Sequence, residues 1–261
     1  MIHTTRIVFI GAGNMATRLA IALYECGYPI VQVYSRTIQS AQTLAQMLGD
    51  DVSYTNDLSQ VVNDAHLYIF SLSDAALPDV VSKMPHNNAM WVHTAGSMPM
   101  DVFSGKTQHY GVLYPMQTAS KERSFDWTEV PIFIEAASSD DLNFIENIAR
   151  SLSNQVVLSS SQQRQALHLA AVFACNFSNH MYAIAEKLLA EQGLKFDVMK
   201  FLIRETEHKA ENISPLKAQT GPAVRNDENV MQKHLSLLRG TPECELYRMI
   251  SESIIQYNSN K

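Results

Sequence analysis

The sequence predicts an α/β protein, with a doubly wound sheet followed by an all-α region. Short apolar runs alternate with amphipathic helical stretches up to residue 158, a pattern typical of strands joined by crossover helices. Beyond this point the strand-like runs stop, and residues 161–192 contain neither proline nor glycine. We therefore expect two domains, residues 1–158 around the sheet and residues 159–261 built from helices.

The first predicted strand, residues 6–10, leads directly into a glycine-rich turn. Gly11, Gly13 and Ala16 form the pattern G-x-G-x-x-A, which continues as an amphipathic helix. Gly11 permits the tight turn, Gly13 lets a pyrophosphate approach the backbone, and Ala16 lets the helix pack closely on the strand. The free N–H groups of the helix N-terminus then face the phosphates. This context predicts a dinucleotide site of the Rossmann type, with contacts from Gly11, Ala12, Gly13, Asn14 and Met15.

The end of the second strand decides between NAD and NADP. An NAD site carries a carboxylate there, but the strand at residues 30–34 runs into Ser35, Arg36 and Thr37. A guanidinium flanked by two hydroxyls offers a 2′-phosphate charge-assisted hydrogen bonds, whereas a carboxylate would repel it. We therefore expect NADP, with Arg36 as the main phosphate contact. The alternative is that Ser35 only caps the next helix and that Arg36 is solvated.

Three later strands, expected at residues 67–70, 90–93 and 111–114, end in loops at the edge of the sheet that borders the nucleotide. The expected cofactor contacts from these loops are Ser71, Leu72, Thr94, Ala95 and Gly96, and the expected substrate contact is Gln117. For Ser71 and Leu72 the alternative is ordinary turn chemistry. Gly96 frees the backbone to approach a ligand, and Asp74 is expected to cap the following helix. The remaining strands are expected at residues 52–54, 131–135 and 155–158.

A long helix, predicted at residues 161–192, is apolar on nearly every side. No residue between Arg164 and Glu186 carries a formal charge at pH 7. Such a helix is buried from several directions, and a small domain does not supply that much cover alone. We therefore expect the helix at the centre of a homodimer interface, with C2 symmetry as the default. Its polar residues argue against a membrane span.

Polar residues on this helix are predicted to share one side. At 100° per residue, His168, Asn176 and Asn179 fall within roughly 80° of one another, along with Gln165. We predict that this stripe lines a substrate cleft, with His168 and Asn176 as candidate catalytic residues and Asn179 as a substrate contact. The alternative is that each is a hydrogen-bonded buried group.

Further helices are expected at residues 196–210, 227–239 and 242–257. The turn before the second of these contains Arg225, whose planar guanidinium suits either a substrate carboxylate or a surface acid. Asp227 is expected to cap the helix that follows.

Composition narrows the possible partners. The net charge of −6, without a long basic block, argues against a nucleic-acid partner. The three cysteines show no C-x-x-C spacing, which disfavours a zinc site or a disulfide framework and fits a reducing compartment. We expect a cytoplasmic protein with a small-molecule substrate, without a metal and without a nucleic-acid or membrane partner.

The assembled motifs resemble a known bacterial family from end to end. Residues 10–16, Ile-Gly-Ala-Gly-Asn-Met-Ala, are similar to the opening of pyrroline-5-carboxylate reductases and of deazaflavin-dependent NADP oxidoreductases. More specific likenesses lie at residues 93–97, 114–118, 168–176 and 220–227. These resemble a family with a Rossmann domain and an uncharacterised helical C-terminal domain, whose members are labelled NADP oxidoreductases. The resemblance implies a helical, dimerising second domain and supports NADP.

Better-known relatives differ from this chain in the long helix predicted at residues 161–192. Related hydroxyacid dehydrogenases carry a lysine four residues before an asparagine, and if Asn176 matches that asparagine, Val172 occupies the lysine position. His168 is then the expected acid or base, because histidine titrates near neutrality.

We expect an NADP-dependent oxidoreductase that transfers hydride between NADPH and a small carbonyl or imine compound, with His168 as proton donor. The alternatives are a pyrroline-5-carboxylate reductase-like imine reductase, a non-enzymatic NADP-binding sensor, and a dimeric scaffold that no longer binds nucleotide, against which the intact Gly11, Gly13 and Arg36 argue. The sequence leaves open whether a deazaflavin replaces the organic substrate. The segment Val172–Asn176 replaces the Ser/Gly-rich imine site of the reductases, which places proline synthesis second.

Overall fold

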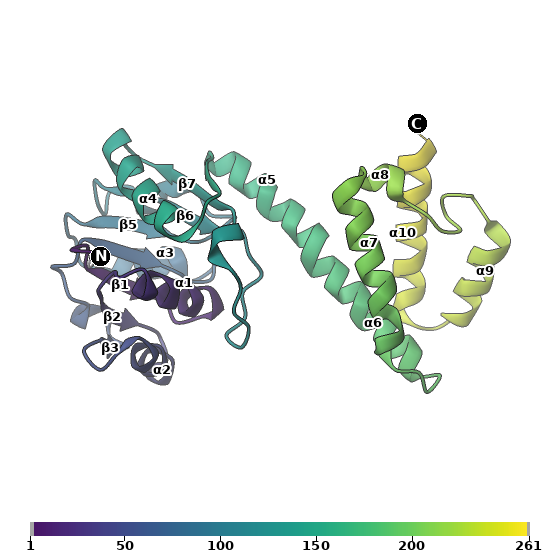
Figure 1. Ribbon diagram of the computed structural model, residues 1–261, viewed down its shortest axis with the longest axis horizontal. Coiled ribbons are helices and arrows are strands. Elements are labelled where there is room, and N and C mark those ends of the chain that lie inside the picture. Colours follow the sequence, from purple (N-terminus) through teal and green to yellow (C-terminus); the bar gives the residue numbers. More distant parts are fainter. Residues whose placement is uncertain (1–2, 260–261) are drawn as a thin grey trace. The chain divides into compact units, whose positions relative to one another are not determined.

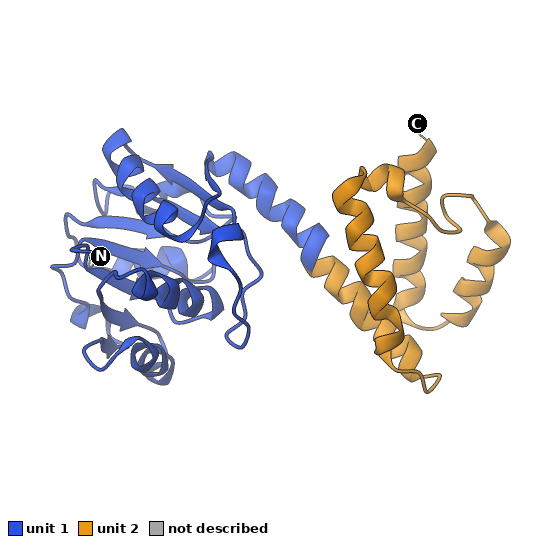
Figure 2. Cartoon of the chain, in the orientation of Figure 1, with its two compact units in different colours: residues 1–175 blue, residues 176–261 orange. Residues whose placement is uncertain are grey.

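The computed structural model describes residues 3–259. The chain divides into two compact units, Met1–Cys175 and Asn176–Lys261 (Figure 2). The first unit contains a sheet, and the second is helical. Within residues 3–259, none of the helices reaches the length and hydropathy of a membrane span.

The first unit is built on an eight-stranded sheet with the order β3-β2-β1-β4-β5-β6-β7-β8 (Figure 1). Its strands are β1 (Ile7–Ile10), β2 (Ile30–Tyr34), β3 (Ser53–Thr55), β4 (Leu67–Phe70), β5 (Met90–His93), β6 (Tyr110–Pro115), β7 (Ile132–Ala136) and β8 (Val156–Leu158). Neighbouring strands pair in parallel, except that β6 and β7 are antiparallel. The predicted α/β fold class is confirmed, and every predicted strand lies within one residue of its predicted bounds.

Both faces of this sheet are buried. The helices that cover it are α1 (Asn14–Glu25), α2 (Ile38–Leu48), α3 (Leu77–Lys83) and α4 (Ser139–Leu152), with the short 3₁₀ turns η1 (Leu58–Gln60), η2 (Met100–Phe103) and η3 (Trp127–Glu129). Along β1, Ile7 and Phe9 join the core under α1, α2 and α4, whereas Val8 and Ile10 join the core under α3. All four are fully buried, which explains the unbroken apolar run.

The order of the strands creates a crevice next to β1. The chain moves from β1 to β2 and β3 on one side and then returns to β4 on the other. At such a reversal the loops that leave neighbouring strands diverge and open a space at the carboxyl ends. The turns after β1, β2 and β4 border this space.

The long helix starts at the predicted residue but is not uniform. It consists of α5 (Ser161–Ala171), the π-helical segment η4 (Val172–Phe177) and α6 (Ser178–Ala190), which follow one another without a break (Figure 1). In a π-helix the backbone bonds from residue i to i+5, so each residue turns through less than 100°. The predicted 80° stripe of His168, Asn176 and Asn179 assumed constant α-helical steps, which the segment Val172–Phe177 does not follow, so the stripe stays a prediction from the sequence.

The second unit contains α6 and further helices. These are η5 (Phe196–Met199), α7 (Lys200–Asn212), the short and unpredicted α8 (Pro215–Ala218), α9 (Glu228–Leu237) and α10 (Pro242–Ser259). As predicted, Asp227 caps α9, because its carboxylate accepts from the N–H of Val230. Among the described residues of this unit only Ala223 is buried. Its helices therefore leave much of their apolar surface open.

Candidate functional site

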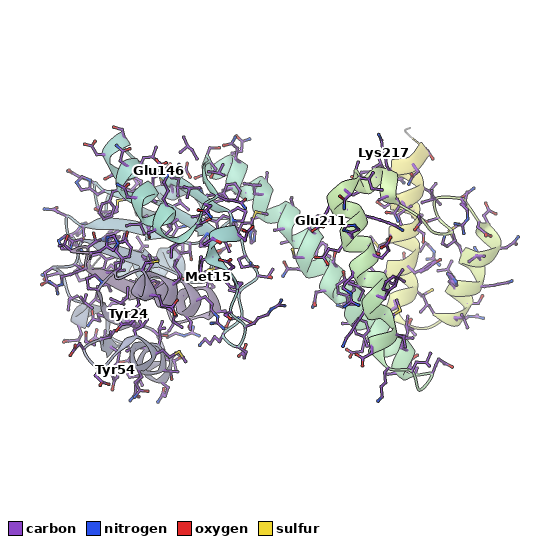
Figure 3. The ribbon with its side chains drawn as sticks, viewed as in Figure 1. Met15, Tyr24, Tyr54, Glu146, Glu211 and Lys217 are labelled. Carbon is purple, nitrogen blue, oxygen red and sulfur yellow. The ribbon has the colours of Figure 1, made fainter. Side chains whose placement is uncertain are left out.

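The glycine-rich turn between β1 and α1 has the geometry that a dinucleotide requires. Gly11 has a φ of +119°, and a Cβ atom there would lie 2.2 Å from the carbonyl oxygen of Ser71. Gly13 is the N-cap of α1, and a Cβ added there would meet no atom within 4 Å. Figure 3 labels Met15, which lies in the first turn of α1. The turn thus leaves open space in front of the helix N-terminus, where a pyrophosphate fits.

Two adjoining pockets extend from this turn. The nucleotide pocket, a cavity of about 740 Å³, contains the predicted contacts Gly11, Ala12, Gly13, Ser35, Arg36, Thr37, Ser71 and Leu72. The histidine pocket, a cavity of about 350 Å³, contains the predicted residues Gly13, Asn14, Met15, Ser71, Leu72, Thr94, Ala95, Gly96, Gln117 and His168. Both pockets share Gly13, Ser71 and Leu72, so they form one groove. The structure thus gathers every predicted cofactor contact along this groove.

A hydrogen bond joins two of the cleft loops. Thr94 Oγ1 donates to Ser71 Oγ over 3.0 Å, which links the loop after β5 to the loop after β4. The Ser97 hydroxyl donates in the same way to the carboxylate of Asp74. The prediction that Asp74 caps the next helix is wrong, because α3 begins after Ala76 and its start has no side-chain cap. Asp74 instead ties the two loops together.

His168 lies on α5 at the other end of the groove, packed against Gly96. A Cβ atom on Gly96 would lie 2.7 Å from His168 Nδ1, so the imidazole occupies the space that a side chain would fill. Because Gly96 has no side chain, the imidazole of His168 can lie directly against its backbone. The same property would let a ligand approach.

Tyr114 is a second polar group in the histidine pocket that the sequence prediction did not include. Its hydroxyl lies 3.4 Å from His168 Nδ1, and the two rings meet edge to face with centroids 6.4 Å apart. Burial raises the pKa of Tyr114, which keeps the phenol protonated at neutral pH. The proline that follows Tyr114 at the end of β6 drew attention to the loop but not to this side chain.

Arg164 is the residue that fixes His168 to the sheet. Its guanidinium is fully buried and forms an ion pair of 2.5 Å with Glu135 of β7. The same group donates to the carbonyl oxygens of Ala95 and Met98 at 3.3 Å and 2.5 Å. Arg164 thus holds the cleft loop after β5 against α5, one turn before His168. The sequence offered only a weak signal, an arginine four residues before the candidate histidine.

His93 ends β5 beneath this loop and is held neutral. Its Nδ1 accepts from the N–H of Ala95 at 3.2 Å, and Nε2 lies 3.3 Å from the carbonyl oxygen of Pro99. A neutral ring with its proton on Nε2 satisfies both contacts. Burial, and secondly the charge of Arg164, lower the pKa of His93 from 6.5 to about 3.

The other predicted substrate residues are exposed. Gln117 lines the histidine pocket, and its side-chain oxygen accepts from the N–H of Thr118 at 2.8 Å. Asn176, Asn179 and Arg225 are exposed side chains of the second unit. The structure therefore brings Gln117 together with His168 and leaves the roles of the other three as predictions.

The groove and the fold define a dinucleotide-binding α/β protein with a helical C-terminal region. Residues 6–92 match the family described as NADP oxidoreductase coenzyme F420-dependent. Residues 130–254 match the family described as domain of unknown function (DUF2520). No curated protein matches the sequence.

A solved structure from Bacteroides fragilis is 52% identical over 97% of this chain and 98% of that one, with a TM-score of 0.90. That protein is described, provisionally, as an NADP oxidoreductase. The chain belongs to the family of this protein, in which an NADP oxidoreductase domain of the coenzyme F420-dependent type precedes a DUF2520 domain. The predicted family resemblance is confirmed.

More distant structures share the fold. A Thermotoga maritima protein is 19% identical over 97% of this chain and 99% of that one, with a TM-score of 0.79. An imine reductase from Streptomyces aurantiacus is 13% identical over 96% of this chain and 93% of that one, with a TM-score of 0.69. A pyrroline-5-carboxylate reductase from Coxiella burnetii is 18% identical over 99% of this chain and 98% of that one, with a TM-score of 0.55. At these identities the likeness is one of fold alone.

The neutral state of His93 predicts a pH dependence of stability. The unfolded chain protonates this histidine near pH 6.5, whereas the folded protein keeps it neutral down to about pH 3. The unfolded state therefore binds more protons between these values, and the stabilisation present above pH 6.5 is lost as the pH falls. The slope from this one group is about 1.4 kcal/mol per pH unit.

Urea unfolding of the wild type and of His93→Gln, measured at intervals from pH 7.5 to pH 4, checks this prediction. The free energy of unfolding of the variant should be lower at pH 7.5 but should fall less steeply on acidification. Parallel profiles for the two proteins would show that His93 does not carry the effect.

Proposed function

We propose that this protein is an NADP-dependent oxidoreductase that transfers hydride between NADPH and a small carbonyl or imine compound. The observation that carries the proposal is the continuous groove with Gly13 in its middle, Arg36 at one end and His168 with Tyr114 at the other. Family membership supports the same class of activity. The three cysteines are free, which supports the cytoplasmic location that we propose with it.

Arg36 favours NADP over NAD in this proposal. It follows β2 and lines the nucleotide pocket together with Ser35 and Thr37. These three residues occupy the place where an NAD site presents a carboxylate to the ribose. A guanidinium there attracts the 2′-phosphate and forms charge-assisted hydrogen bonds with it.

His168 is the proposed proton donor. Bound NADPH supplies the hydride, and the reduced carbonyl or imine then needs a proton at its oxygen or nitrogen. In the imidazolium form of His168, Nδ1–H can donate to the hydroxyl oxygen of Tyr114, and the Nε2 proton is available to the substrate; its transfer leaves a neutral imidazole. We propose Gln117 as a substrate contact in the same pocket. Asn176 as a catalytic residue, and Asn179 and Arg225 as substrate contacts, stay predictions from the sequence.

The second unit supports a proposed homodimer. Helices α6, α7, α9 and α10 contain no buried residue. On η5 and α7, Val198, Phe201 and Leu202 follow helical spacing and are 63%, 73% and 55% exposed. An apolar stripe of this kind on a helix is ordinarily covered. A second copy of the chain is the occupant that we propose, with C2 symmetry.

Cofactor binding is the first property to measure. Calorimetric titration with NADPH and NADH should show tighter binding of NADPH to the wild type. Arg36→Ala should weaken NADPH binding by about 10- to 100-fold and leave NADH binding nearly unchanged, because the lost contact is charge-assisted and specific to the phosphate. An unchanged preference for NADPH in the variant would remove Arg36 from the site, and the absence of any nucleotide binding would overturn the proposed function.

Proton donation predicts a separate effect on turnover. With a panel of carbonyl compounds, cyclic imines and a deazaflavin, the wild type should oxidise NADPH with at least one of them. His168→Gln should lower kcat by about 100-fold or more while the Kd for NADPH stays the same, because general acid catalysis contributes about 10²–10⁴-fold. Tyr114→Phe should have a smaller effect and should change the pH profile of kcat. Normal kcat in His168→Gln would exclude it as the donor.

The oligomeric state tests the dimer. Light scattering after gel filtration should give twice the chain mass for the wild type and the single mass for Phe201→Glu, since a buried unpaired charge opposes association. Glu207→Lys changes a charge on the opposite side of α7, nine residues from Val198, and should remain dimeric. A monomeric wild type at micromolar concentration would contradict the proposal.

A further inference from the structure

A second cation lines the nucleotide pocket besides Arg36. Arg36 follows β2, whereas Lys83 ends α3, on a separate element of the fold. Asp79, in the first turn of α3, lines the same pocket. The pocket therefore receives two positive side chains and one carboxylate from elements on different sides of it.

Lys83 forms an ion pair with Asp79 of the same helix. Its Nζ lies 2.8 Å from Asp79 Oδ2, four residues earlier on the helix, and the two side chains are 61% and 63% exposed. Exposed pairs of this kind contribute little to stability, so the lysine can change partner at small cost. A phosphate monoester carries between one and two negative charges at neutral pH, against the single charge of Asp79.

Tyr34 gives a second indication that these charges surround one space. It ends β2 and lines the nucleotide pocket. The pKa of Tyr34 is raised mainly by burial, and it also responds to the charges of Lys83, Asp57, Asp79 and Arg36. The three charged residues that line the pocket are thus among the four that act on this side chain.

We propose that Lys83 is a second ligand of the cofactor's 2′-phosphate and that Asp79 holds it at the pocket until the phosphate arrives. This proposal rests on the NADP binding proposed above. Arg36 and Lys83 then contact the phosphate from two elements, and Asp79 opposes its binding because it competes for the lysine. The pair determines how strongly the protein prefers NADP to NAD.

Substitution of Lys83 and substitution of Asp79 should change the affinity for NADP⁺ in opposite directions. An ion pair with a purely structural role would not produce this difference. In calorimetric titrations with NADP⁺, NAD⁺ and 2′,5′-ADP, Lys83→Gln should weaken NADP⁺ and 2′,5′-ADP binding by about 5- to 20-fold and leave NAD⁺ unchanged. Asp79→Asn should tighten NADP⁺ binding by about 2- to 5-fold, since it frees the lysine and removes a repelling charge. Lys83→Arg should retain the preference for NADP⁺.

Lys209→Gln is the matched control. Lys209 also pairs with a carboxylate four residues earlier, Glu205, but it lies on α7 in the second unit. This variant should bind all three nucleotides as the wild type does, and thermal melting should show that every variant is folded.

The results separate this proposal from the proposed function. If Lys83→Gln keeps the wild-type ratio of NADP⁺ to NAD⁺ affinity, or if both variants weaken NADP⁺ equally, the role of Lys83 is overturned. NADP⁺ binding that still depends on Arg36 would then leave the proposed function standing. A wild type that binds no NADP⁺ would overturn both.

Discussion

The buried guanidinium of Arg164 is the interaction on which the candidate site depends. A charged group without contact to water is costly unless it is paired and its donors are satisfied. Glu135 supplies the opposite charge, and two backbone carbonyls and the hydroxyl of Ser161 accept the other hydrogen bonds. These partners come from β7, from the loop after β5 and from α5 itself. Arg164 therefore joins three segments that are far apart in the sequence.

The position of His168 follows from these contacts of Arg164. Because α5 is held against the loop after β5, the imidazole reaches the backbone of Gly96 and the hydroxyl of Tyr114. The same positive charge adds to burial in keeping His93 neutral beneath that loop. A neutral His93 bonds the backbone on both sides of Gly96. One ion pair thus stabilises both the proposed proton donor and the loop that borders the cofactor groove.

The sequence predicted the features that depend on local patterns. The strand at β1 is an unbroken apolar run because both of its faces are buried, and the G-x-G-x-x-A turn is defined by steric needs within a few residues. Arg36 could be predicted to line the pocket because the fingerprint fixes its place after β2, and it does so. These patterns accounted for the sheet and for the cofactor side of the groove.

What the sequence did not predict depends on partners that are distant along the chain. Tyr114 meets His168 across 54 positions, and Arg164 meets Ala95 across 69. Asp74 has the residue type and place of a helix cap, yet the hydroxyl of Ser97 competes for its carboxylate. In each case the residue type was visible, but the partner followed only from the tertiary fold.

The π-helical segment lies within the predicted polar stripe and changes the angular steps along it. His168 lies on α5 before this segment, within the unit that contains the cofactor groove, whereas Asn176 lies in the segment itself and Asn179 after it. Periodicity cannot detect a π-turn, because the apolar composition of residues 172–177 suits an α-helix equally well. The groove, Arg164, Tyr114 and His168 all belong to the first unit. The proposed nucleotide binding and proton donation therefore rest on the packing of that unit alone. The exposed apolar helices of the second unit are what the proposed association of two chains would cover.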